Sequence, residues 1–150
     1  MMQKNKMVLF VCTGNTCRSP FAAAVWNRLA RERGMSVRAE SCGLAAVSGE
    51  ESSPAAIEAA QNLGYDIKEH RARGASAYLL EEAEHIYVMS PSHLRAIENA
   101  NAEWGKKTSL LSPDGVPDPY GGNAEVYRNA YEAIEEAVRK RMDHREAGEA

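Results

Sequence analysis

The stretch from Met7 to Pro20, MVLFVCTGNTCRSP, joins a short apolar run to a loop that holds two cysteines and an arginine. Residues 7–11 are continuously apolar, which is typical of a strand buried inside a parallel sheet. Ser19 and Pro20 end the stretch; serine is a good helix N-cap, and proline is favoured at the first helical position. We therefore predict a strand, a tight loop and a helix in direct succession.

The rest of the chain alternates between the same two kinds of element. Further strands are expected at residues 36–41, 85–89 and 108–111, and further helices beginning near residues 53, 77, 90 and 124. The segment 112–123 is too rich in proline and glycine to be regular. Strands that alternate with helices predict an α/β fold, in which a parallel sheet carries helices on both faces. The length suits one domain spanning residues 1–150.

Composition and charge exclude several classes of protein. The formal net charge is −3 and no basic stripe is visible, which argues against nucleic acid as a partner. Three cysteines are too few for a disulfide scaffold, and no secretory signal or membrane span is visible, so we expect a cytoplasmic protein that does not enter membranes. Cysteine and histidine form no metal-ligand pattern, so neither a metal nor another cofactor is expected. We expect packing or surface roles for the histidines, which are His70, His85, His93 and His144.

The loop that follows the first strand has the spacing of an anion site, with five residues between Cys12 and Arg18. A loop of this length can curl so that successive backbone N–H groups point inward and form a nest for a tetrahedral oxyanion. Arg18 adds a planar fork that can bond two phosphate oxygens. Gly14 and Asn15 tolerate the positive φ that tight curling requires, and the following helix directs its positive end at the same point. The expected phosphate-binding residues are Thr13, Gly14, Asn15, Thr16, Cys17, Arg18 and Ser19.

Cys12 is the candidate nucleophile of this loop. Helix N-termini and nearby cations favour the thiolate form of a cysteine, and the Ser19 hydroxyl can donate a hydrogen bond to it. The alternative is that Cys12 is a small buried turn residue and Arg18 a surface cation, because a bare Cys-x5-Arg spacing arises by chance. The buried strand, the Gly-Asn curl and the Ser-Pro helix start around the pattern favour the functional interpretation.

Asp118 is the candidate general acid, because expulsion of a leaving group from phosphorus is easier when a proton arrives with it. Asp118 is flanked by two prolines that would hold it stiffly, and Tyr120 is placed to form one wall of a substrate cleft. The loop follows the fourth predicted strand, so it should share a sheet edge with Cys12. A turn role for Asp118 and an acid role for Asp114 are the alternatives.

Three segments carry a resemblance to a known family: Val11 to Pro20, Ser41 to Gly43, and Asp118 to Tyr120. Together they resemble the low-molecular-weight protein-tyrosine phosphatases. The resemblance implies a three-layer α/β sandwich whose four-stranded parallel sheet has the order 2-1-3-4. It also implies Cys12 as nucleophile, Arg18 as phosphate binder and Asp118 as general acid. Phosphorylated proteins would be the substrates, a phospho-cysteine the intermediate and inorganic phosphate the product.

Thr16 departs from the tyrosine-directed branch of this family, which usually has isoleucine there. Thr16, together with Gly121 and Gly122, is similar to the bacterial protein-arginine-phosphatase branch. Isoleucine would leave the N–H donors of a phosphoguanidine unpaired, at a cost of about 1–3 kcal/mol each if buried. We therefore expect Thr16 and Tyr120 to select the substrate, with phosphoarginine favoured over phosphotyrosine. The alternative is that Thr16 has no part in the choice.

Cys17 lies in the same loop as Cys12, and two interpretations stay open. It could form a reversible disulfide that protects Cys12 from irreversible oxidation, or it could simply pack at the helix start. Two rival functions rank lower. An arsenate reductase would need further relay cysteines, and residues 74–101 contain none. A phosphocysteine carrier would need no general acid, so Asp118 argues against it.

Overall fold

The computed structural model describes residues 7–148. Its strands form one parallel sheet in the order β2-β1-β3-β4, as the family resemblance implied. The strands are β1 (Met7–Cys12), β2 (Arg38–Gly43), β3 (His85–Val88) and β4 (Thr108–Leu110). Residues Val8 to Val11 are fully buried, because β1 has a strand on each side and helices above and below.

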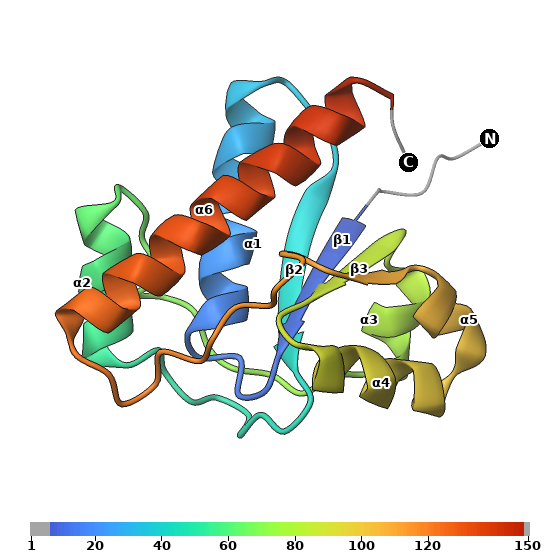
Figure 1. Cartoon of the computed structure of the whole chain (residues 1–150), viewed down its shortest axis with the longest axis horizontal. Coiled ribbons are helices and arrows are strands. Elements are labelled where there is room, and N and C mark those ends of the chain that lie inside the picture. Colours follow the sequence, from blue (N-terminus) through green and yellow to red (C-terminus); the bar gives the residue numbers. More distant parts are fainter. Residues whose placement is uncertain (1–6, 149–150) are drawn as a thin grey trace.

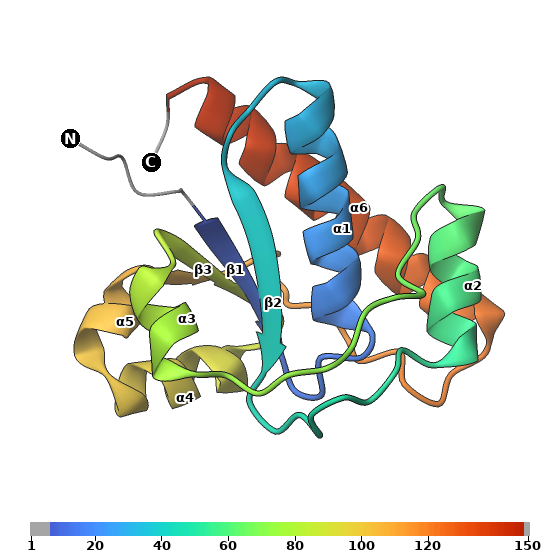
Figure 2. The same cartoon turned by 180° about the vertical axis from the view of Figure 1, so that it is seen from behind.

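Helices cover both faces of the sheet, as the alternating pattern predicts. They are α1 (Arg18–Glu32), α2 (Pro54–Asn62), α3 (Ala77–Glu82), α4 (Pro91–Ala100), α5 (Ala102–Lys106) and α6 (Ala124–Glu146). Figure 1 shows α1, α2 and α6 on one side of the sheet and α3, α4 and α5 on the other, and the reverse view in Figure 2 agrees. The long closing helix α6 lies across α1.

The side chains on the two faces of β1 pack into two separate hydrophobic clusters, because successive side chains of a strand point to opposite faces. Val8 and Phe10 pack into the larger cluster with α1 and α6. Leu9 and Val11 pack into the smaller one with α3 and α4. The apolar run of residues 7–11 therefore anchors the middle of the sheet and fixes where Cys12 emerges from it.

The start of α1 differs from the expected one. The helix begins at Arg18, and Cys17 stands at the cap position without a side-chain cap hydrogen bond. Ser19 is therefore not the N-cap, because its hydroxyl is engaged with the Cys12 sulfur. The expected Ser-Pro starts are confirmed at Ser53 and Ser90, whose side chains accept from the backbone N–H groups three residues on.

Other boundaries shift by a few residues. β2 begins at Arg38 rather than residue 36, because its register pairs Met7 with Arg38 and Cys12 with Gly43 along the whole of β1. The short helix α5 is not expected from the apolar pattern; it begins after Asn101, whose side chain accepts from two backbone N–H groups. α6 extends beyond residue 142 to Glu146.

Candidate active site

The loop after β1 is pinned to the end of β2 by backbone hydrogen bonds. Leu44 N donates to Cys12 O at 3.0 Å, and Ala45 N donates to Thr13 O at 2.9 Å. A Cβ atom on Gly43 would lie 2.6 Å from Thr13 O, so only glycine permits this close approach. The Ser41 to Gly43 segment therefore sets the position of the first residues of the loop.

The left-handed turn of the loop falls on Asn15, whose φ is 56°. Asparagine tolerates this conformation better than other residues with a Cβ, because its short polar side chain bonds locally. Gly14 does not take a positive φ, so the sequence-based expectation was right for Asn15 and wrong for Gly14.

Asn15 is also the centre of a buried hydrogen-bond network behind the loop. Its Nδ2 donates to Ser19 Oγ at 2.8 Å and to Ser41 Oγ at 3.0 Å, and its Oδ1 accepts from Arg73 N at 3.0 Å. Its carbonyl oxygen lies 2.7 Å from His70 Nε2. A buried, satisfied network of this kind holds the loop rigidly.

Two donors converge on the sulfur of Cys12. Asn15 N donates to Sγ at 3.3 Å, and Ser19 Oγ lies 2.9 Å from Sγ. Ser19 Oγ already accepts from the Asn15 side chain, and its other acceptor, Cys42 O, is farther away at 3.5 Å. The Ser19 hydrogen is thus directed at the sulfur, and both donors stabilise negative charge there.

Arg18 is held at the site by the segment between β4 and α6. Its Nη1 donates to Val116 O at 2.8 Å, and its Nη2 lies 3.7 Å from Asp118 Oδ2. The residue is 5% exposed. In Figure 1 that segment runs past the first turn of α1, which explains how residues about a hundred positions apart meet. A buried guanidinium fork fixed in this way is suited to bind an oxyanion.

Asp118 faces the same space from the opposite loop. Its side chain is half exposed, and its Oδ1 accepts from Tyr120 N at 3.1 Å and lies 3.8 Å from Cys17 Sγ. Asp114 does not line the hollow that Cys12 and Asp118 share. The geometry therefore favours Asp118 over Asp114 as a group able to exchange a proton with a bound ligand.

These residues enclose a hollow of about 220 Å³. Its lining consists of Cys12, Thr13, Gly14, Thr16, Cys17, Arg18, Ala45, Val47, Glu50, Asp118 and Tyr120. Asn15 and Ser19, expected to touch phosphate, are not among the lining residues, and both contact the sulfur of Cys12. Glu50 was not singled out from the sequence, because it lies in a loop without any recognisable pattern.

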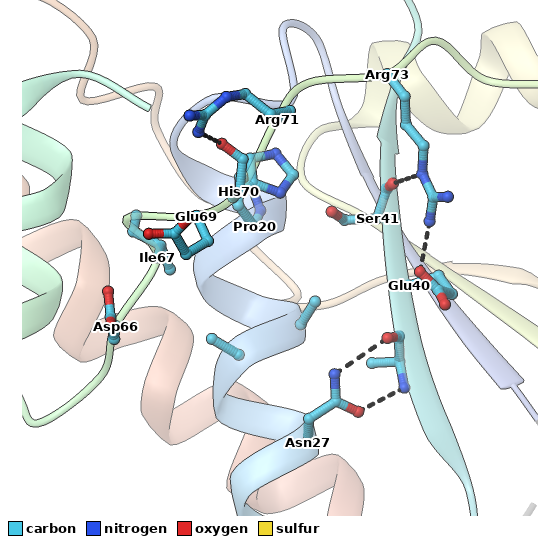
Figure 3. A pocket seen from close by; sticks show the side chains of 13 residues that line it. Pro20, Asn27, Glu40, Ser41, Asp66, Ile67, Glu69, His70, Arg71 and Arg73 are labelled. Carbon is cyan, nitrogen blue, oxygen red and sulfur yellow. Dashed lines mark hydrogen bonds and ion pairs between the residues drawn. The ribbon is translucent and has the colours of Figure 1, made fainter. Parts of the chain in front are cut away.

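A larger hollow of about 370 Å³ lies behind the loop, between α1, β2 and residues 66–73 (Figure 3). Arg73 crosses one side of it and pairs with Glu40. Neither Cys12 nor Asp118 lines this space. The smaller hollow is therefore the candidate chemical site, because it alone of the two is lined by Cys12 and Asp118.

Two histidines touch the loop, although the sequence suggested only packing or surface roles. His70 contacts the carbonyl of Asn15, and His93 Nε2 lies 2.9 Å from Thr13 Oγ1. Burial, aided by the positive charge of Arg18, lowers the pKa of His93 to about 4. Burial also lowers the pKa of His70. The only sequence signal for His93 is its place just after a strand that ends at the same sheet edge.

Cys17 is buried beside the hollow and carries a protonated thiol. Burial, followed by the negative charge of Asp118, raises the pKa of Cys17 to about 11. Its carbonyl oxygen accepts from Tyr131 OH at 2.8 Å. All cysteines in residues 7–148 are free, including the fully buried Cys42.

Neither a metal centre nor a membrane segment is found in the part of the chain that the structure describes. Over residues 7–148, no three histidine, cysteine or acidic side chains converge as metal ligands. None of the helices in that range is both long enough and apolar enough to cross a bilayer.

The fold and the loop together place the chain among the cysteine-based phosphatases. A model of the family described as low molecular weight phosphotyrosine protein phosphatase matches residues 7–147, and the chain belongs to that family.

The relatives of this chain include phosphatases of two substrate classes. A protein-arginine-phosphatase of Bacillus subtilis (strain 168) is 30% identical over 139 residues, covering 89% of this chain and 92% of the relative. A putative low molecular weight protein-tyrosine-phosphatase of Klebsiella pneumoniae is 32% identical over 135 residues, with 87% and 91% covered. The solved YwlE arginine phosphatase, a cysteine-to-serine mutant with a phosphorylated active site serine, superposes with a TM-score of 0.84 at 29% identity, with 89% and 91% covered.

Proposed function

We propose that this chain hydrolyses a phosphorylated side chain of proteins through a phospho-cysteine intermediate, with phosphoarginine preferred over phosphotyrosine. The observation that carries the proposal is the position of Cys12 Sγ. Two donors are directed at this sulfur, and it shares one hollow with the guanidinium of Arg18 and the carboxyl group of Asp118. We also propose that the protein works in the cytoplasm, which suits free cysteines.

In the first step the sulfur of Cys12 attacks phosphorus. The S–P bond forms while the bond from phosphorus to the leaving atom breaks, and the electron pair stays with that atom. Asp118 supplies the proton that the leaving atom takes up. The fork of Arg18, together with the backbone N–H groups of the loop that are not bonded to the sulfur, holds the equatorial oxygens, whose charge grows in the transition state.

In the second step water attacks the phospho-cysteine. Asp118, now a carboxylate, accepts a proton from the water, and Cys12 leaves as a thiolate. Asn15 N and the Ser19 hydroxyl stabilise that leaving sulfur as they did before the attack. Inorganic phosphate is released and the site returns to its initial state. The phosphorylated serine of the solved YwlE mutant supports phosphoryl transfer to this position in a relative.

The preference for phosphoarginine rests on Thr16 and Asp118. Thr16 lines the hollow and carries a hydroxyl group, whereas an isoleucine there would present only carbon. A guanidino group carries several N–H donors. Thr16 and Asp118 can accept hydrogen bonds from these groups, whereas an apolar wall cannot. Phosphotyrosine is the second candidate, because Tyr120 is 69% exposed at the edge of the hollow and could stack on a substrate ring.

The test compares kcat/KM for a phosphoarginine peptide with that for a phosphotyrosine peptide of the same flanking sequence. A higher value for phosphoarginine supports the proposal, and hydrolysis of phosphotyrosine alone rejects the preference. Steady release of p-nitrophenol from p-nitrophenyl phosphate distinguishes a hydrolase from a phosphocysteine carrier, which would stop after one turnover. The Cys12→Ser variant should lose turnover and keep phosphate binding.

We further propose that Cys17 protects Cys12 by forming a reversible disulfide with it. Both cysteines line the same hollow, so an oxidised Cys12 would lie close to the Cys17 thiol. The raised pKa of Cys17 keeps this thiol protonated and unreactive in the reduced enzyme.

A further inference from the structure

Glu50 is the acidic residue of the hollow that the reaction does not use. It lines the hollow together with Cys12 and Asp118. We propose that the Glu50 carboxylate accepts hydrogen bonds from the guanidinium group of a phosphoarginine substrate and so favours it over phosphotyrosine. The proposal rests on the function proposed above and assigns one more residue to substrate selection.

The backbone holds Glu50 in a defined place. Glu50 N donates to Val47 O at 3.2 Å, and Glu50 O accepts from Ala72 N at 2.8 Å. The next residue, Glu51, pairs with Arg71 in an antiparallel bridge. The backbone of Glu50 is therefore held by Val47 on its N–H side and by Ala72 on its carbonyl side.

Adjacent side chains in this extended pairing serve different purposes. Glu51 forms an ion pair with Arg71 at 3.2 Å and does not line the hollow. Glu50 lines the hollow, whereas its neighbour Glu51 is engaged with Arg71 outside it. Across residues 7–148 no cation forms an ion pair with Glu50, so its carboxylate is available to a ligand.

The charge of the lining fits a substrate that brings a cation. Arg18 is the one basic residue of the lining, whereas Glu50 and Asp118 are both acidic. A second carboxylate repels a phosphate dianion and offers nothing to an aromatic ring. A phosphoguanidinium group carries positive charge and N–H donors beside its phosphoryl group. The Glu50 carboxylate matches the cationic part and Arg18 the phosphoryl part, while the protonated Asp118 is left to act as the acid.

The test measures the ratio of kcat/KM for phosphoarginine to that for phosphotyrosine, in peptides that contain no other lysine or arginine. In Glu50→Gln this ratio should fall about tenfold, because a neutral amide oxygen replaces the charged acceptor and binds the guanidinium more weakly. Glu51→Gln is the matched control and should keep the wild-type ratio, since Glu51 does not line the hollow. Loss of its exposed ion pair with Arg71 should also cost little stability. The restriction on the peptides ensures that a flanking cation cannot produce the effect.

A binding measurement separates substrate recognition from chemistry. In the Cys12→Ser background, adding Glu50→Gln should weaken phosphoarginine binding about tenfold by calorimetry. Suppose that the wild type hydrolyses phosphoarginine but Glu50→Gln changes neither the kcat/KM ratio nor the binding. That result would overturn the role of Glu50 and leave the proposed function standing. A wild type that does not hydrolyse phosphoarginine would overturn the proposed preference, and with it this inference.

Discussion

Thr13 Oγ1 lies 2.9 Å from His93 Nε2, a contact that joins the loop after β1 to α4 across 80 residues of sequence. The other ring nitrogen, His93 Nδ1, is buried without a partner in the described part of the chain. A buried N–H without an acceptor is costly, so the hydrogen belongs on Nε2 and is donated to Thr13. The Thr13 hydroxyl then keeps its own hydrogen and can donate it into the hollow.

The burial of His93 makes the stability of the protein depend on pH. The pKa of His93 is about 4 in the folded protein, against 6.5 for an ordinary histidine. Between these values the unfolded chain binds more protons, so the free energy of unfolding should fall as pH drops from about 7 to 4, with His93 contributing up to ~3 kcal/mol. The lowered pKa values of His70 and His85 act in the same direction.

Urea unfolding at a series of pH values measures this dependence. His93→Gln, which retains a donor near the position of Nε2 but does not titrate, should show a shallower loss of stability between pH 7 and 4 than the wild type. A variant that loses stability with pH as steeply as the wild type would show that His93 is not responsible.

A general-acid role for Asp118 predicts an effect that depends on the leaving group. Asp118→Asn should lower kcat for phosphoarginine by about 10²–10⁴-fold, because a poor leaving group needs the proton. The loss should be much smaller for p-nitrophenyl phosphate, whose leaving group departs without help. Asp114→Asn is the matched control, since Asp114 lies outside the hollow. Equal losses for both substrates would reject Asp118 as the acid.

The strands and helices were predictable from local patterns and the strand order from the family resemblance, whereas part of the site depends on contacts between distant residues. The apolar run of residues 7–11 and the two Ser-Pro helix starts gave the strand and helix positions, and Cys12, Arg18 and Asp118 lie together as expected. His93 and Glu50 were missed because only the folded chain brings them to the loop. Of the two roles expected for Ser19, the hydrogen bond to the Cys12 sulfur is confirmed and the helix N-cap is not, because the hydroxyl is engaged with that sulfur.

Thr16 can be tested by exchanging it for the residue of the tyrosine-directed branch. Thr16→Ile should lower kcat/KM for phosphoarginine and raise it for phosphotyrosine, shifting the ratio about tenfold or more, because isoleucine leaves guanidino N–H groups unpaired and offers an apolar wall to a ring. Thr16→Ser, which keeps the hydroxyl, is the control and should retain the preference. If both substrates respond equally to Thr16→Ile, residue 16 is not the selector.

Cys17 predicts how the enzyme recovers from oxidation. Hydrogen peroxide should convert Cys12 to a sulfenic acid, which Cys17 then attacks to form a disulfide that dithiothreitol reduces. Wild-type activity should therefore return after the reductant is added, while Cys17→Ser should lose activity irreversibly as Cys12 proceeds to the sulfinic acid. Because the pKa of Cys17 is raised to about 11, disulfide formation should be slow and should accelerate with pH.

Cys42→Ala serves as the control and should recover like the wild type. Full recovery of Cys17→Ser after the same exposure would show that Cys17 only packs at the start of α1.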